Sequence, residues 1–161
     1  MTKTHQNSRS LGIRAEPGAF NWAVVDGSQA APALHAYGTE KAPAAYSEAE
    51  SLAWVRRRVL QIIQQYGPTG VAVRYPEPTA RGATKDSARA RSRVEGVVLE
   101  VASSGNLQVV TGTLNTISKN LGSKSAKNYL ASDDFRGLDW SKHKANVQEA
   151  ILVAASILVE E

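Results

Sequence analysis

One acidic residue, Glu149, stands inside a C-terminal segment, residues 145–159, whose body is almost wholly apolar. Burying a carboxylate is costly unless it is paired, so this residue needs a cationic partner or a ligand role. Two further glutamates, Glu16 and Glu77, lie beside prolines in predicted loops. Three such acids together would be suitable ligands for a divalent cation. For Glu16 and Glu77, exposed loop positions are the simpler interpretation.

A second feature is the concentration of positive charge in residues 79–93. This range holds five basic residues and one acid, so its excess of four equals the net charge of +4 of the whole chain. Lys85, Arg89 and Arg93 recur every four residues and would form a stripe along a helix, where the phosphates of a nucleic acid could bind. A solvated helix face is an equally good interpretation. The candidate nucleic-acid-binding residues are Arg81, Lys85, Arg89 and Arg93.

Several other chemistries lack the residues that they need. The chain has no Cys, which excludes disulfides, thiolate–zinc sites and a cysteine nucleophile, and its three His residues are widely separated. It has no phosphate-binding G-x-x-x-x-G-K motif. The aspartates within residues 132–139 are better explained by Asx turns than by cation binding. We therefore expect no cofactor and no bound metal.

Length and composition indicate a single domain. A chain of 161 residues, 42% of them hydrophobic, can build one substantial core and is too short for two comfortable ones. Residues 1–10 are polar and aperiodic, which predicts a disordered tail before one domain at 11–161. No signal peptide is apparent, and no run reaches the roughly 18 apolar residues of a membrane helix. We therefore expect a cytoplasmic protein with no membrane partner.

Hydrophobic patterning predicts alternating strands and helices. Two apolar runs flank the turn Glu16-Pro17-Gly18, which predicts a β-hairpin over 11–26, and a third strand follows at 34–38. Ser47 begins a capping box for a helix that ends at Gly67. The remaining predicted elements are a strand at 70–75, a helix from Asp86 or Ser87 to Gly105, a strand at 107–110, two short helices in 113–130 broken at Gly122, and a final helix to Val159 capped by Ser141. Within the second long helix, Arg91 is spaced to pair with Glu95.

The order of these elements and three local motifs resemble the RuvC-like branch of the ribonuclease H superfamily. The first motif is Leu11-Gly12-Ile13 before a Pro/Gly turn, and the second is an Arg-x-x-Gly at residues 93–96 inside ARARSRVEGVVLEV. The third, residues 146–150, is similar to the closing Asp-x-x-Asp-Ala of that family. The resemblance implies an α/β, ribonuclease H-like fold. Its mixed five-stranded sheet has the order β-β-β-α-β-α-β-α and helices on both faces.

The same resemblance implies that the metal-binding site of the family is degenerate here. Its four acidic positions fall on Arg14, Arg74, Asn146 and Glu149. Metal-dependent phosphodiester cleavage needs carboxylates, whereas an arginine stays protonated and cannot ligate a cation. The resemblance therefore implies a cluster of these four residues with no catalytic and no metal-binding member. Two guanidinium groups facing one carboxylate would leave a spare positive charge, which suits an anion such as phosphate.

We therefore expect a non-catalytic RuvC-like protein that binds nucleic acid, either DNA or RNA, or a protein partner such as a second copy of itself. One alternative is a metal-dependent nuclease with a relocated acidic site formed by Glu16, Glu77 and Glu149. The other is a structural or oligomerisation module. Salt-dependent binding of nucleic acid would support the non-catalytic protein, and metal-dependent cleavage would support the nuclease. A concentration-dependent mass without either would support the oligomerisation module.

Overall fold

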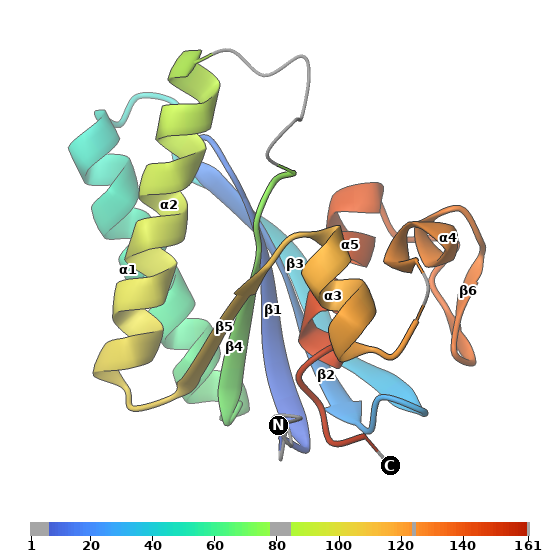
Figure 1. The fold of residues 1–161 in the computed structure, drawn as a ribbon. Helices are drawn as coiled ribbons and strands as arrows, with labels where there is room; N and C mark the ends of the chain where they lie inside the picture. The colour runs from blue at the N-terminus through green and yellow to red at the C-terminus, as the bar shows by residue number, and fades with distance from the viewer. Residues whose placement is uncertain (1–6, 78–84, 124, 161) are drawn as a thin grey trace.

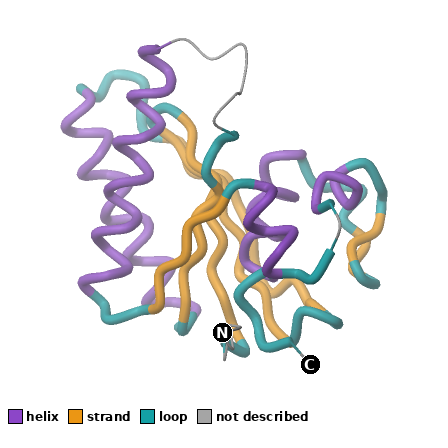
Figure 2. Tube along the Cα trace, in the orientation of Figure 1, coloured by secondary structure: helices purple, strands orange, loops and turns teal. Residues whose placement is uncertain are grey.

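A mixed sheet forms the centre of the molecule in the computed structural model, which describes residues 7–77, 85–123 and 125–160 (Figures 1 and 2). The strands are β1 (Arg9–Glu16), β2 (Ala19–Gly27), β3 (Pro32–Lys41), β4 (Gly70–Arg74) and β5 (Gln108–Gly112). Their order in the sheet is β3-β2-β1-β4-β5. The first three strands are antiparallel neighbours, while β1, β4 and β5 run parallel. The predicted mixed five-stranded sheet is confirmed.

Helices cover both faces of this sheet (Figure 1). The long helices α1 (Glu48–Tyr66) and α2 (Lys85–Ser104) lie side by side on one face. The other face is covered by α5 (Ala145–Ala155), beside which lie the short helices α3 (Leu114–Asn120) and α4 (Ala126–Leu130). A small hairpin of β6 (Asp134–Phe135) and β7 (Leu138–Asp139) precedes α5. No helix in the described ranges is long and apolar enough to cross a membrane.

The alternation of side chains along β1 decides which residues meet α5. Leu11 and Ile13 point into the core beneath α1 and α2. Gly12 faces α5, where an added Cβ would lie 1.9 Å from the Ala150 carbonyl oxygen. A glycine is therefore required for the helix to pack this closely on the strand. Because side chains alternate in a strand, Arg14 shares the face of Gly12 and points towards α5.

The caps of α1 agree with the sequence prediction. Ser47 and Glu50 form the reciprocal hydrogen bonds of a capping box, and Gly67 ends the helix in the left-handed region with φ 59°. For the last helix the prediction was wrong at both ends. The N-cap is Lys144, while the Ser141 hydroxyl donates instead to Asp139. The helix ends at Ala155 because the following chain turns to form β-bridges, one of which joins Leu158 to Asn7.

The predicted tail at residues 1–10 also needs correction, because residues 7–10 belong to the folded core. Asn7 is 4% exposed and its amide donates to the Ile157 carbonyl oxygen at 2.9 Å. Its side-chain oxygen accepts from the Thr69 hydroxyl at 2.5 Å. Arg9 and Ser10 begin β1. The sequence pattern suggested disorder because it does not reveal these partners, which are distant in sequence. Residues 1–6 lie outside the described part of the chain.

Candidate functional site

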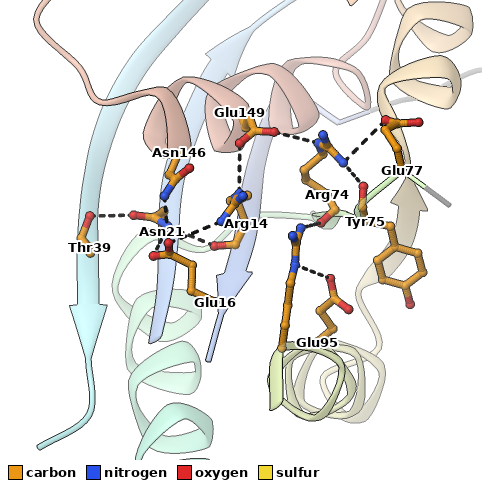
Figure 3. Close-up of polar contacts among 11 residues, drawn as sticks. Arg14, Glu16, Asn21, Thr39, Arg74, Tyr75, Glu77, Glu95, Asn146 and Glu149 are labelled. Carbon is orange, nitrogen blue, oxygen red and sulfur yellow. Dashed lines mark hydrogen bonds and ion pairs between the residues drawn. The ribbon is translucent and has the colours of Figure 1, made fainter. Parts of the chain in front are cut away.

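A cluster of charged side chains lies where β1 and β4 end, beneath the first turns of α5 (Figure 3). The parallel register of the two strands pairs Ile13 with Val73, so Arg14 and Arg74 come next on adjacent strands. Glu149 approaches both from α5. Two guanidinium groups and the three carboxylates that contact them form what we call the arginine–glutamate cluster: Arg14, Arg74, Glu16, Glu77 and Glu149.

Glu149 is shared equally between the two arginines. Arg14 Nε donates to one carboxylate oxygen and Arg74 Nε to the other, each at 3.0 Å. The side chains of Arg74 and Glu149 are 8% and 12% exposed, and that of Arg14 is 20% exposed. Charge-assisted hydrogen bonds of this length, largely removed from water, hold all three groups in fixed positions.

Two further carboxylates complete the cluster. Glu16 Oε1 lies 3.5 Å from Arg14 Nη1, and Glu77 Oε1 lies 3.7 Å from Arg74 Nη1. The cluster thus holds three carboxylates against two guanidinium groups. The expected spare positive charge is therefore absent, because Glu16, the last residue of β1, and Glu77 both contact the arginines, although the sequence favoured exposed loop positions for them. An anion would gain little from this centre.

Amide and hydroxyl groups anchor the Glu16 end of the cluster. Glu16 accepts from Asn146 Nδ2 at 2.9 Å and from Asn21 Nδ2 at 3.1 Å. Asn21 is 2% exposed, and its side-chain oxygen in turn accepts from the Thr39 hydroxyl at 2.8 Å. The hydrogen-bonded network therefore reaches from α5 across β1 and β2 to β3 (Figure 3).

The Arg74 end is anchored to the segment after β4 and to α3. Arg74 Nη1 donates to the Tyr75 carbonyl oxygen in addition to its contact with Glu77. Glu77 Oε1 accepts from the backbone N–H of Leu114, the first residue of α3, at 2.8 Å. A carboxylate at this position satisfies one of the free N–H groups at the start of a helix.

These residues do not fit a divalent metal ion. Guanidinium groups stand at the two strand positions where the resemblance places metal-binding acids. The three carboxylates of the predicted relocated site are instead engaged by the contacts described above. Within residues 7–77, 85–123 and 125–160, no group of three or more Asp, Glu, His or Cys side chains is arranged to hold a metal.

Arg91 of α2 is a neighbour of the cluster that sequence reasoning did not include. Its Nε lies 3.4 Å from Glu95 Oε2, which confirms the predicted pairing, and its Nη2 donates to the Arg74 carbonyl oxygen at 3.4 Å. Burial lowers the pKa of Arg91, and repulsion from Arg14 lowers it further. Burial raises the pKa of Glu95 despite the opposing effect of Arg91. Nothing in the sequence pattern distinguishes Arg91 from its exposed neighbours, because its orientation depends on how α2 crosses the sheet.

A cavity of about 220 Å³ opens between the cluster and α2. Its lining residues come from the β1–β2 turn, the segment after β4 and one face of α2: Arg14, Glu16, Pro17, Pro76, Ser87, Ala88, Arg91 and Ser92. Arg14 and Arg91 are the two cationic residues among them.

The structure does not bring the predicted basic stripe into the cluster. Lys85, Arg89 and Arg93 are all exposed on α2. Arg93 Nη1 lies 2.9 Å from Glu48 of α1, so this side chain is directed towards the neighbouring helix. Arg81 lies outside the described residues. A role for these four residues in nucleic-acid binding therefore stays a prediction.

Comparison with known proteins supports the fold assignment. No protein-family model and no curated protein matches the sequence. Among solved structures, Thermus thermophilus RuvC is similar with a TM-score of 0.75 and 19% identity over 92% of both chains. RuvC of T. thermophilus in complex with a Holliday junction substrate is similar with a TM-score of 0.72 and 17% identity, and the match covers 92% of this chain and 90% of that chain. The yeast mitochondrial Holliday junction resolvase Ydc2 is similar with a TM-score of 0.67 and 9% identity, and the match covers 97% of this chain and 80% of that chain.

These similarities confirm the predicted RuvC-like, ribonuclease H-like fold. The match with T. thermophilus RuvC extends over most of the described part of the chain. At such low sequence identity the likeness establishes the fold alone.

Proposed function

We propose that this protein binds branched nucleic acid through a RuvC-like fold and does not cleave it. The observation that carries the proposal is the arginine–glutamate cluster, in which Arg14 and Arg74 share Glu149 at 3.0 Å. Two cationic side chains thus fill the place where a nuclease of this fold would hold its ions.

Support for binding comes from the likeness to proteins that act on DNA junctions. One of the similar structures is RuvC in complex with a Holliday junction substrate, and it is matched over 90% of its length. The net charge of +4 favours a polyanionic partner. The cavity beside the cluster is lined in part by α2, the helix that carries the exposed Lys85 and Arg89, and these side chains could contact backbone phosphates.

Support for the absence of cleavage comes from the chemistry of phosphodiester hydrolysis. Metal-assisted cleavage needs ions that activate water and stabilise the leaving oxygen. Arg14 and Arg74 cannot ligate such ions, and the nearest carboxylates already accept hydrogen bonds or form ion pairs with the arginines. No group in the described cluster replaces that function.

The proposal is tested by binding measurements with a labelled four-way DNA junction, a duplex of the same sequence and a single strand. Anisotropy titrations in EDTA and in Mg²⁺, each at several salt concentrations, should give junction binding that does not depend on the metal and that weakens steeply with salt. Absence of salt-dependent binding to all three probes would overturn the proposal. A concentration-dependent mass with no such binding would instead favour an oligomerisation module.

A further inference from the structure

A second cavity, of about 170 Å³, lies at the Thr39 end of the hydrogen-bonded network. It opens between the edge strand β3 and the segment that leads into α5. The lining residues are Tyr37, Gly38, Thr39, Lys142, His143, Lys144 and Val147. None of these residues was selected by the sequence motifs.

Tyr37 offers an aromatic surface to solvent at this cavity. It is 52% exposed, more than any other large hydrophobic residue in the described ranges. Its ring makes a T-shaped contact with the ring of His143, with centroids 4.4 Å apart. This contact holds the ring in a defined orientation, so a second flat group can stack on Tyr37 at little cost in side-chain entropy.

Two lysines supply positive charge on the same side. Lys142 and Lys144 are exposed, and neither forms an ion pair within the described part of the chain. Asp139 interacts electrostatically with Lys142, but its carboxylate is already hydrogen-bonded to the hydroxyl and N–H of Ser141. The two ammonium groups thus remain available to an external anion.

We infer that this cavity binds an unpaired nucleotide, with its base stacked on Tyr37 and its phosphate contacting Lys142 and Lys144. An aromatic ring beside free cations is the combination that binds single-stranded nucleic acid. The inference rests on the proposed function and names a second contact for the same ligand. Thr39 lines the cavity and donates to Asn21, which in turn donates to Glu16, so the cavity adjoins the Glu16 end of the arginine–glutamate cluster.

The test compares variants in anisotropy titrations with two single strands, one with normal bases and one with abasic sites. Tyr37→Ala should weaken binding of the normal strand about tenfold, the expected loss for one stacked base. The same change should leave the abasic strand unaffected, and Tyr37→Phe should retain wild-type binding. Tyr46→Ala, which alters the other exposed tyrosine, is the matched control.

A double change of the lysines tests the phosphate contact separately. Lys142→Gln with Lys144→Gln should weaken the binding of both strands. It should also reduce the salt slope, which is the slope of log affinity against log salt concentration, by about 1.4, as expected for two single-strand phosphate contacts. Arg57→Gln with Lys127→Gln removes two exposed charges elsewhere and should change neither strand's affinity.

The outcomes separate this inference from the proposed function. Wild-type binding that survives Tyr37→Ala unchanged, or that falls equally with Tyr46→Ala, would overturn the nucleotide site while leaving junction binding intact. A loss in Tyr37→Ala that is the same for the abasic strand would also overturn it, because no base would be involved. Failure of the wild type to bind any strand or junction would overturn both.

Discussion

Arg14 and Glu149 are 135 positions apart in the sequence, yet Arg14 Nε donates to the Glu149 carboxylate at 3.0 Å. The contact depends on the close packing of α5 against β1 at Gly12. It joins the first strand to the last helix, at positions that the sequence resemblance assigns to metal-binding acids. The ion pair therefore ties the first strand of the sheet directly to the helix packed across it.

The first prediction concerns the stability of the cluster. Glu149→Ala leaves two largely buried guanidinium groups without their shared partner, and breaking a buried pair in this way costs about 3 kcal/mol of unfolding free energy. The estimate lies at the low end of the usual range because Glu16 and Glu77 remain near the arginines. Urea unfolding followed by the fluorescence of the three tryptophans measures the loss.

Glu100→Ala provides the matched control, since Glu100 and its partner Arg56 are both about half exposed. A solvent-exposed pair contributes little. If Glu149→Ala destabilised the protein no more than this control, the cluster would not contribute to stability.

The second prediction is a pH dependence that originates in Glu95. Burial raises the pKa of its carboxyl in the folded state, so the folded protein holds this proton more tightly than the unfolded chain. The stability of the wild type relative to Glu95→Gln should be greatest below the ordinary pKa of a glutamate. It should fall as the pH rises through the raised pKa of the folded state.

Paired unfolding curves for the wild type and Glu95→Gln between about pH 3 and about pH 8 give this difference. Groups with lowered pKa values, such as Glu50 and Asp139, are common to both proteins and cancel. A constant difference would mean that folding does not shift the pKa of Glu95, and a difference that grows with pH would mean that folding lowers this pKa; either result would contradict the prediction.

The third prediction separates the basic stripe of α2 from the rest of the molecule. Lys85→Gln with Arg89→Gln should reduce the salt slope of junction binding by about 2, as expected for two lost phosphate contacts. Folding should be unchanged because both side chains are exposed. Arg93 is left intact because it contacts Glu48 of α1. An unchanged slope would identify the stripe as a solvated helix face.

The fold could be predicted from the sequence because its local signals agree with the final structure. The hairpin turn at Glu16-Pro17-Gly18 and the two helices broken at Gly122 are found as predicted. The signals failed where long-range contacts decide. Asn7 is fixed by Thr69 in the middle of the chain and by Ile157 near its C-terminus. A local difference is found in the segment 132–139, which forms the β6–β7 hairpin although its turn-rich composition predicted a loop.

The candidate site could be predicted only in part. The resemblance placed Arg14 and Arg74 in one cluster with Glu149, and the structure has these contacts. The inward turn of Glu16 and Glu77 could not be foreseen, because it depends on amide groups such as Asn146 that meet them only in the folded state. Arg91 was missed for the same reason, since its direction is fixed by the packing of α2.

The fourth prediction asks whether the arginines are what keeps metal out. The variant R14D/R74E would place acids on both strands beside Glu149, a set that suits divalent cations. Its melting temperature should be lower than that of the wild type in EDTA and should rise when Mn²⁺ is added. The wild type should melt at the same temperature in both buffers. Stabilisation of the wild type by Mn²⁺, or a variant that stays unfolded in Mn²⁺, would contradict this account of the site.

The central claim, binding without cleavage, is tested most directly by following a four-way junction held in its complex with the wild-type protein. End-labelled junction, fully bound at saturating protein, is incubated with Mg²⁺ or Mn²⁺ and analysed on a denaturing gel, beside a sample in EDTA. We predict full-length strands under all conditions, because Arg14 and Arg74 stand where the ions would bind. Metal-dependent products that appear with the wild type and disappear with Glu149→Gln would contradict the claim.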